Sequence, residues 1–420
     1  MCAGASRELF RMSQMTAQHD VSVPAAPAGG RSPFVRLTEL IAGIEPGKPV
    51  INLSVGEPQH PIPGFVGPVL AANLAAFGRY PANKGSDPFR AAVAQWLGRR
   101  YALPQPIDPD RNVLVLAGTR EGLFLSALAA NRFVAPRPGK SGVLPAMLIP
   151  NPFYAVYSAA AAAAGCEPVY LPATEATNFL PDLDAVAETT WARTVAIYLA
   201  SPSNPQGAVA GLDYLKRLVA LARRFGFLIF SDECYSEIYN TAARPHGILE
   251  AAGPGYANTV AFHSLSKRSS LPGLRVGFAA GDDKFLAAFL ELRNVAAPQV
   301  PVALQQVAAA AYNDETHVEE NRRLYNAKFD LADQIIGDRY GYKRPAGGFF
   351  LWLDMSAYGT SEAVTKKLWK EAGVRVVPGR YLARDQADGS NPGEGYIRVA
   401  MVQNKDATAE ALHRLVALFG

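Results

Sequence analysis

The sequence predicts an α/β protein: a mostly parallel sheet with helices on both faces, followed by a smaller α+β domain. Two observations support this. From residue 113 to residue 262, short apolar runs alternate with helical stretches, and repeated strand–helix units form parallel sheets that are buried on both faces. After about Arg293, longer helices and a few short β runs replace that alternation, which indicates a second domain.

Five apolar runs are predicted as strands of the large sheet, and each ends at a polar or proline-rich turn. They cover residues 113–116, 146–149, 194–199, 227–230 and 259–262. The helices predicted between them include residues 121–130 and an alanine run, 159–164, that stops at a glycine. In the second domain, residues 349–353 and 396–400 are predicted as strands, and helices near residues 300–330 join the two domains.

The composition excludes several classes of protein. The 41 basic and 37 acidic residues are spread along the chain, without the basic stripe typical of nucleic-acid binding. Six scattered histidines show no metal-ligand spacing, so no metal site is expected. No apolar run reaches the length of a membrane span. Three cysteines are too few, and odd in number, for a disulfide framework, which predicts a reducing, cytoplasmic compartment.

Polar residues cluster where the predicted strands end. Asn204 lies in the turn Ser201-Pro-Ser-Asn-Pro-Gln-Gly207, Asp232 follows the 227–230 run, and Lys267 follows the 259–262 run. Ligands of open parallel sheets bind outside the carboxyl ends of the strands. The positions of these side chains therefore predict a binding site, independently of any family.

Lys267 alone would most often be a solvated surface residue. Its neighbours favour another interpretation: Asp232 and Asn204 lie at other strand ends, and Arg275 follows shortly after the lysine. An amine, a carboxylate, a guanidinium and an amide at neighbouring strand ends are the groups that pyridoxal phosphate requires. The sequence thus favours a binding site for this cofactor around Lys267.

Three motifs resemble those of the fold-type I pyridoxal-phosphate enzymes, class I aminotransferases in particular. They are Ser201-Pro-Ser-Asn-Pro-Gln-Gly207, Asp232-Glu-Cys-Tyr235, and Ser264-Leu-Ser-Lys267 through Leu274-Arg-Val-Gly277. The likeness runs from about Val50 to the C-terminus. It implies a seven-stranded large-domain sheet, aminotransferase activity with pyridoxal 5′-phosphate, and a homodimer with shared active sites.

The expected division of the chain has four parts. Residues 1–30, rich in Ala, Ser, Pro and Gly, are interpreted as a flexible arm or as sequence added by a start codon assigned too early. Residues 31–62 are expected to contribute to the small domain. Residues 63–300 are expected to form the large cofactor-binding domain, and residues 301–420 the small C-terminal domain.

The resemblance implies roles for the catalytic residues. Lys267 would hold the cofactor as a Schiff base and, once displaced by substrate, move a proton at the substrate Cα. Asp232 would pair with the protonated pyridine nitrogen and keep the ring an electron sink. Tyr235 and Asn204 would hydrogen-bond the phenolic oxygen of the ring. Alone, Asp232 could simply cap a turn, and Asn204 could form an Asx turn before proline.

Other residues match the positions that bind the phosphate and the ring. Ser264 and Arg275 would supply a hydroxyl and a guanidinium to the phosphate. The backbone of Gly118-Thr119-Arg120, just before a predicted helix, would add amide groups and the helix dipole, although it could also be an ordinary helix start. Tyr154 would stack on the cofactor ring, whereas its spacing alone would more often place it in the core.

Three further matches concern the substrate and the partner subunit. Tyr80 would reach the phosphate bound by the neighbouring subunit. Arg398 would bind the α-carboxylate of the substrate with its guanidinium fork, and Gly56 would contact the same carboxylate through its backbone, next to Asn204. The simpler alternatives are an exposed strand arginine at position 398 and a turn glycine at position 56.

Among aminotransferases, the sequence resembles the bacterial N-succinyldiaminopimelate group most. The stretches Gly56-Glu-Pro-Gln-His-Pro61, Ala117-Gly-Thr-Arg-Glu-Gly-Leu123 and the run from Ser264 to Arg275 carry this likeness. It implies that glutamate donates its amino group to N-succinyl-2-amino-6-oxopimelate. That substrate is polyanionic, and Arg293 and Lys84 are candidates for its distal end, with plain surface exposure as the alternative for both.

Other activities use the same motifs. A class I aminotransferase of broad, alanine or aspartate specificity and a β-eliminating lyase both fit Lys267 and Arg398. A pyridoxal-phosphate-binding regulator would need an N-terminal DNA-binding module, and the segment before Val50 is too short and too rich in proline and glycine for a helix-turn-helix.

Overall fold

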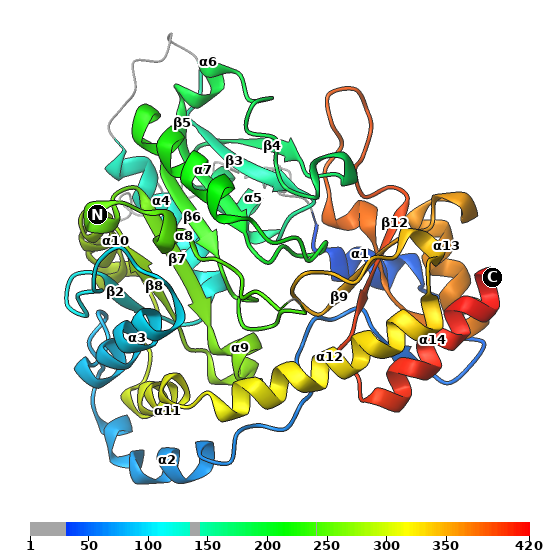
Figure 1. Cartoon of the computed structure of the whole chain (residues 1–420), viewed down its shortest axis with the longest axis horizontal. Coiled ribbons are helices and arrows are strands. Elements are labelled where there is room, and N and C mark those ends of the chain that lie inside the picture. Colours follow the sequence, from blue (N-terminus) through cyan, green and yellow to red (C-terminus); the bar gives the residue numbers. More distant parts are fainter. Residues whose placement is uncertain (1–30, 135–142, 241) are drawn as a thin grey trace, which may run out of the picture.

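The computed structural model describes residues 31–134, 143–240 and 242–420. Its centre is a sheet with the strand order β2-β8-β7-β6-β5-β3-β4 (Figure 1). All neighbouring pairs are parallel except those of β8, which runs antiparallel to β7 and β2. The predicted mostly parallel, seven-stranded sheet is thereby confirmed. The strands are β2 (Val113–Leu116), β3 (Ala146–Asn151), β4 (Glu167–Pro172), β5 (Thr194–Ala200), β6 (Leu228–Asp232), β7 (Thr259–Ser264) and β8 (Gly277–Gly281).

Four strands, β3, β5, β6 and β7, extend one or two residues beyond the predicted runs, and two strands were not predicted. β3 continues through Pro150 because its pairing with β5 ends at Leu148, so the missing N–H of the proline is not needed there. β6 ends two residues later than predicted, which makes Asp232 its last residue. β4 and β8 were absent from the prediction.

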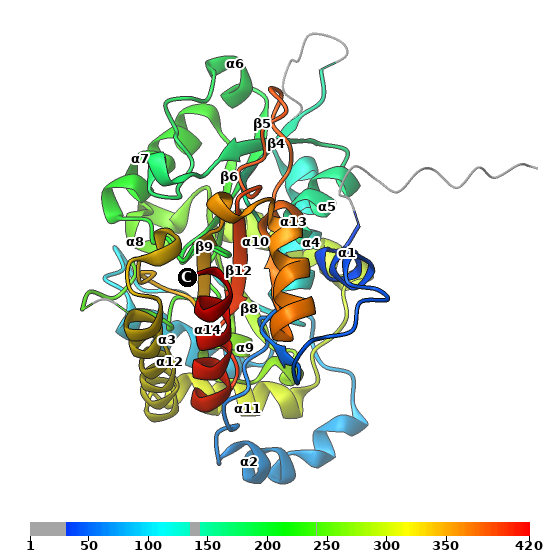
Figure 2. The ribbon, with the colours of Figure 1, turned by 90° about the vertical axis from the view of Figure 1, so that its right-hand side faces the viewer.

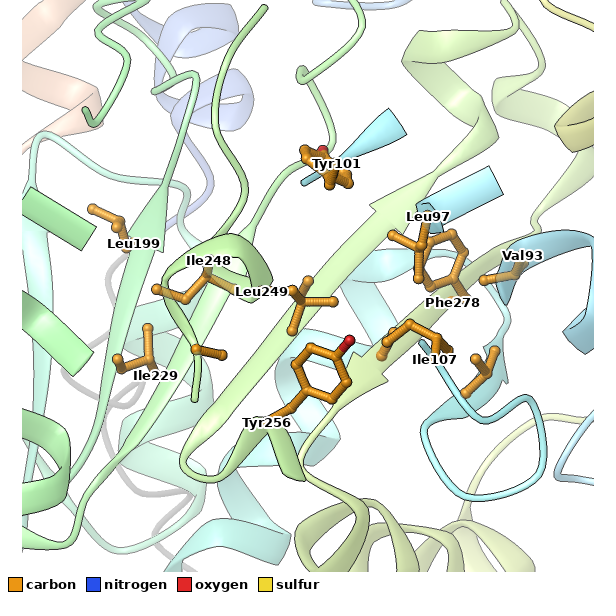
Figure 3. Packing of buried hydrophobic residues seen from close by; sticks show 14 of the residues in the cluster. Val93, Leu97, Tyr101, Ile107, Leu199, Ile229, Ile248, Leu249, Tyr256 and Phe278 are labelled. Carbon is orange, nitrogen blue, oxygen red and sulfur yellow. The ribbon is translucent and has the colours of Figure 1, made fainter. Parts of the chain in front are cut away.

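Helices cover both faces of the sheet, as predicted. α3 (Asp87–Arg100), α7 (Leu212–Phe225) and α11 (Val302–Asn313) pack on one face, and α4 (Thr119–Phe133), α5 (Val156–Ala163) and α10 (Asp283–Ala296) pack on the other. Strand residues alternate between these two cores because successive side chains point to opposite faces. Val115 therefore faces the first core and Leu114 the second. Figure 3 shows part of the first core, where α3, β5, β6 and β8 contribute side chains.

A second, three-stranded antiparallel sheet has the order β11-β12-β9. Its strands are β9 (Phe350–Asp354), β11 (Val377–Pro378) and β12 (Tyr396–Ala400), and helices α13 (Ser361–Lys367) and α14 (Lys405–Phe419) lie beside them (Figure 2). Part of the N-terminal segment belongs to this small-sheet region, since β1 (Ile51–Asn52) pairs with β10 (Val374–Arg375). α12 (Thr316–Ile336) runs between the two sheets (Figure 1).

The remaining helices are α1 (Pro33–Leu40), α2 (Val66–Ala72), α6 (Glu188–Trp191), α8 (Ile248–Ala251) and α9 (Leu265–Arg268). No helix within the described ranges is long and apolar enough to cross a membrane. The same residues include no group of three or more His, Cys, Asp or Glu side chains that could hold a metal ion. The predicted N-terminal arm, residues 1–30, lies outside the described residues.

Candidate active site

The loops after β5, β6 and β7 meet at one edge of the large sheet. Ala200, the last residue of β5, is in register with Asp232, the last residue of β6. The parallel strands therefore bring Asn204, Asp232 and Ser264 to the same edge, where ligands of such sheets bind. α9 follows Ser264 directly and carries Lys267. The structure thus places Asn204, Asp232 and Lys267, the strand-end residues that the sequence selected, at one edge of the sheet, with Ser264 beside them.

Asp232 is a buried carboxylate, 8% exposed. Its Oδ2 accepts a hydrogen bond from the Tyr157 hydroxyl at 2.8 Å, and its Oδ1 accepts one from the backbone N–H of Cys234 at 3.2 Å. Buried carboxylates are stabilised by hydrogen bonds or by a positive charge. The parts of the chain that are described place no cation in an ion pair with Asp232, so its charge is available to a cationic ligand atom such as a protonated ring nitrogen.

Lys267 is half-buried, with its Nζ 6.0 Å from the centroid of the Tyr235 ring. Burial has the largest effect on the pKa of its amine and lowers it. Nearby Cys234 and Asp232 raise this pKa, whereas Arg275 and Arg120 lower it further. Because a lowered pKa increases the neutral fraction of the amine, the environment favours Lys267 as a nucleophile and as a proton carrier.

A cradle for an anion lies at the N-terminus of α4. Gly118 precedes this helix with φ = 82° and ψ = 156°, a conformation that is almost restricted to glycine. A Cβ at this position would overlap the guanidinium of Arg275. That guanidinium donates to the carbonyl of Pro272 at 2.8 Å, and no described carboxylate pairs with it. Helix N-terminal amides beside an unpaired guanidinium are suited to a phosphate.

Ser264 lies at the same edge, but its hydroxyl already has local partners. Its Oγ accepts from the backbone N–H of Ser266 at 3.1 Å and donates to the Ser266 hydroxyl at 2.9 Å. Ser264 therefore caps α9, and a phosphate contact would share this hydroxyl with Ser266.

Replacing Gly118 with alanine should weaken the binding of pyridoxal phosphate about 10- to 100-fold. The added methyl group displaces Arg275 and strains the backbone. Absorbance titration of the apoenzyme measures the Kd. Gly165→Ala is the matched control, since Gly165 also has a positive φ, +70°, but a Cβ there meets nothing within 4 Å. Equal losses of affinity in both variants would contradict the assignment of Gly118 to a phosphate-binding cradle.

Arg120 contributes its side chain to the site, although the sequence suggested only its backbone. Its exposed guanidinium donates from Nε to the Tyr154 hydroxyl at 2.6 Å. The half-buried Tyr154 ring packs edge-on against Tyr157, with 5.7 Å between the centroids, and burial raises the pKa of its hydroxyl. No described carboxylate pairs with Arg120, so its charge is free for an anionic ligand.

Arg398 on β12 is also unpaired, and it is buried, with 4% exposed. It donates to Asn204 Oδ1 at 3.1 Å and to the carbonyl of Ser54 at 2.8 Å, while its Nε has no partner among the described residues. Burial lowers its pKa to about 10, which leaves it charged at neutral pH. Because no described carboxylate neutralises it, this guanidinium is suited to a ligand carboxylate. The alternative of an exposed strand arginine is wrong.

Gly56 and Tyr235 line the neighbourhood of Arg398. A Cβ on Gly56 would lie 2.6 Å from Phe350 Cζ and 3.1 Å from Phe349 Cε2. Close packing, and not a left-handed turn, therefore requires glycine here. Tyr235 is buried and packs edge-on against both phenylalanines at 5.2 and 5.8 Å. Its hydroxyl makes no hydrogen bond to another described residue, which leaves it free for a ligand oxygen.

Three predicted residues lie apart from this group. Tyr80 is 95% exposed, and no hydrogen bond or ring contact joins it to another described residue. Arg293 is 1% exposed and forms an ion pair with Glu121. Arg293 is therefore unavailable to a substrate, and both suggestions for it, a distal-pocket residue and an exposed surface residue, are wrong. Lys84 lies 3.5 Å from Asp110 in a surface ion pair.

Two site residues were not identified from the sequence. Tyr157 bonds Asp232 across 75 positions of the chain, and its ring stacks on Tyr198 with 4.6 Å between centroids. Phe350 lies 4.4 Å from the Arg398 guanidinium. An alanine-rich helix and an apolar strand carry these two residues, and neither pattern distinguishes a site residue from a core residue.

The arrangement fits pyridoxal phosphate. Within the described ranges, the site combines a lysine with a lowered pKa, a buried carboxylate without a counter-ion, a glycine cradle beside a guanidinium without a carboxylate partner, and a buried arginine with an unpartnered Nε. When bound, this cofactor supplies an electron sink for bond breaking at the Cα of an amino acid. The residues that would hold it and its substrate are Lys267, Asp232, Tyr235, Asn204, Gly118, Thr119, Ser264, Arg275, Tyr154 and Arg398.

The sequence profile of aminotransferase class I and II matches residues 48–415. The chain is 32% identical to the LL-diaminopimelate aminotransferase of Desulforudis audaxviator, over 92% of this chain and 95% of that protein. It is 33% identical to the LL-diaminopimelate aminotransferase of Aquifex aeolicus, over 89% and 92% of the two chains.

Solved structures are similar over nearly the whole chain. An aminotransferase from Neisseria meningitidis matches with a TM-score of 0.86 and 38% identity, covering 93% of this chain and 98% of that one. A probable N-succinyldiaminopimelate aminotransferase from Thermus thermophilus matches with a TM-score of 0.80 and 25% identity, covering 92% and 100%. The fold is that of the fold-type I pyridoxal-phosphate enzymes, as the motifs implied. The chain belongs to the class I and II aminotransferases, and its cofactor is pyridoxal 5′-phosphate.

Proposed function

We propose that this aminotransferase exchanges an amino group between glutamate and N-succinyl-2-amino-6-oxopimelate, in lysine and diaminopimelate biosynthesis. The names of several relatives support a diaminopimelate-type substrate, both with the N-succinyl group and without it. The observation that favours the succinylated form is the unpaired guanidinium of Arg120 beside Tyr154.

Charge distinguishes the two candidate substrates at their distal ends. LL-diaminopimelate ends in an ammonium and a carboxylate. The N-succinyl form replaces this ammonium with an amide and adds a second carboxylate. Arg120 offers a positive charge that attracts the added carboxylate and repels a free ammonium. Arg398 would bind the other end of either substrate, at its α-carboxylate.

The geometry of the side chains supports the proposed roles. Lys267 would take the proton from the substrate Cα onto Nζ and return it, because burial keeps the pKa of this amine low. Asp232, oriented by Tyr157, would hold its negative charge at the ring nitrogen. Tyr235 and Asn204 would bond the ring oxygen. Arg398 would hold the substrate carboxylate, with the backbone of Gly56 beside it.

A substrate comparison with the holoenzyme tests this proposal. With 2-oxoglutarate as the amino acceptor, we expect kcat/KM for N-succinyl-LL-diaminopimelate to exceed that for LL-diaminopimelate about 10- to 100-fold, the contribution of one charge-assisted contact. Glutamate formation is the measurement. The Arg120→Gln variant should lose most of this preference. A preference for LL-diaminopimelate would overturn the succinyl assignment, and a preference for alanine, aspartate or aromatic donors would leave only the general activity.

We also propose a homodimer in which Tyr80 completes the site of the partner. The side chain is almost fully exposed although it is a large aromatic residue, and Phe77 and Leu74 nearby are also exposed, at 52% and 57%. Exposed apolar side chains close together are typical of subunit interfaces. Sedimentation equilibrium distinguishes the dimer from a monomer.

A further inference from the structure

Three side chains outside the site described above form a continuous hydrogen-bonded chain, which we term the His60 relay. It consists of Asn321, His60 and Lys328. Asn321 and Lys328 lie two turns apart on one face of α12, with Tyr325 between them. His60 comes from the segment after β1, and its ring packs on Tyr325 with 4.3 Å between centroids.

The partners assign a direction to every bond of the relay. Asn321 Nδ2 lies 3.0 Å from the carbonyl oxygen of Lys267 and 3.2 Å from that of Arg268, so it donates to both. Asn321 Oδ1 is therefore the acceptor that faces His60 Nδ1 at 2.5 Å, and His60 carries its proton on Nδ1. The bare Nε2 of His60 then accepts from Lys328 Nζ at 2.9 Å. Only a neutral His60 satisfies both contacts.

Lys328 ends the relay in an unusual environment. It is 3% exposed and donates, besides His60, to the carbonyls of Met401 at 3.1 Å and Val402 at 3.4 Å. Its three N–H groups thus have three neutral acceptors, and no described carboxylate pairs with it. A buried ammonium without a counter-ion is costly, and an apolar side chain would pack here at lower cost. The charge is therefore poorly explained by stability alone.

The two ends of the relay bind backbone carbonyls at or near two residues of the site, Lys267 and Arg398. At one end, Asn321 holds the backbone of Lys267 itself. At the other end, Lys328 holds Met401 and Val402, which directly follow β12 and its Arg398. His60 joins these ends and lies four residues after Gly56. His60 is thus linked to the large-sheet half of the site through Asn321 and to the small-sheet half through Lys328.

We propose that His60 is a positioning residue. It fixes the position of Lys267 through Asn321 and the position of Arg398 through Lys328. The proposal rests on the roles given above to Lys267 and Arg398, and it is independent of the identity of the amino acceptor. His60 touches neither substrate nor cofactor. Its two ring nitrogens act on different halves of the site, so their contributions are separable by substitution.

Two substitutions separate the contributions of the two ring nitrogens. The amide of asparagine reaches the position of Nδ1, and the amide of glutamine reaches the position of Nε2. His60→Gln keeps an acceptor for Lys328 but loses the donor to Asn321. We expect this variant to loosen α9 and admit water around Lys267. The pH midpoint of the visible cofactor band should therefore rise by about half a unit or more. The Kd for α-methylglutamate, which has no Cα proton to lose, should change less than about twofold.

His60→Asn has the opposite expectation. It keeps the donor to Asn321 and leaves Lys328 without its acceptor, so the Kd for α-methylglutamate should rise about 5- to 10-fold while the pH midpoint stays within about 0.2 units. Lys328→Met should raise the same Kd, and combining it with His60→Asn should add little, because both remove one interaction. His413→Asn, at an exposed position on α14, is the matched control.

The outcomes separate positioning from packing. Two results would overturn the proposal and make His60 a packing residue beside Tyr325. In the first, both His60 variants change the pH midpoint and the Kd for α-methylglutamate together. In the second, neither variant changes either quantity while the melting temperature falls. If His60→Asn failed to fold, Lys328→Met alone would decide the Arg398 half. A visible band in the wild type that does not titrate would contradict the role of Lys267 itself, and not the relay.

Discussion

Replacing Lys267 with alanine is expected to lower kcat by about four orders of magnitude, while the free energy of unfolding stays within about 1 kcal/mol of wild type. The amine is the group assigned both to the cofactor link and to proton transfer, so its loss removes both functions. The fold should tolerate the change, because burial of the charged amine is unfavourable, as its lowered pKa indicates. Lys267→Arg keeps the charge but has no nucleophilic amine and should be equally inactive.

Steady-state transamination and thermal unfolding of the purified variants are the measurements. Lys284→Ala is the control, since Lys284 is an exposed lysine on α10. Reduction of the wild-type holoenzyme with borohydride, followed by proteolysis, should recover the cofactor label on the peptide that contains Lys267. Native turnover in Lys267→Ala, or a label on another lysine, would show that the assignment of the cofactor lysine is wrong.

Replacing Arg398 with methionine should lower kcat/KM about 10²- to 10³-fold and leave the protein as stable as wild type or more stable. The loss results from removing a two-pronged, charge-assisted contact to the substrate carboxylate. The retained stability of the methionine variant is expected from the environment of the side chain. Arg398 is buried, lies over the Phe350 ring, and has no described counter-ion, so an apolar side chain of similar length suits this position.

Comparison with Arg398→Lys separates charge from geometry. Lysine keeps the charge but not the fork, so kcat/KM should still fall about 10-fold or more. Single-turnover kinetics of the holoenzyme with glutamate alone, followed by the visible cofactor band, and urea unfolding are the measurements. Arg323→Lys, at an exposed ion-paired position on α12, is the control. If Arg398→Met lost stability but kept its kcat/KM, the arginine would be a structural residue and the substrate carboxylate would bind elsewhere.

The fold was predicted where the strands are apolar and rich in β-branched or large side chains. The runs in β2, β5 and β7 matched their strands closely. β8 was missed because its sequence, Gly-Phe-Ala-Ala-Gly, has no β-branched residue, and only its pairing with β7 and β2 makes it a strand. β4 was missed because prolines occupy two of its six positions. Both strands depend on their neighbours and not on local propensity.

The site was predicted where function depends on position at a strand end. Asp232, Asn204 and Lys267 were all predicted in this way. Arg293 failed because the sequence does not show that Glu121, on another helix, neutralises it. Tyr157 and the His60 relay were not predicted for a related reason. Their partners lie 53 to 268 positions away in the chain, and a hydrogen bond over such a distance leaves no local pattern.

The sequence by itself predicted the class of sheet and the edge at which Asn204, Asp232 and Lys267 lie, because these depend on local periodicity and on the residues just after a strand. The roles predicted for Arg275 and Arg398 came from the resemblance to a family. Only the tertiary structure decided which of these charges are already neutralised. Arg293 has a buried partner. In the part of the chain that the structure describes, Arg398 and Arg275 have no counter-ion, and Arg120 donates only to a tyrosine hydroxyl. A charge is free for a ligand only when no side chain folded against it satisfies it, and that depends on contacts between distant parts of the chain.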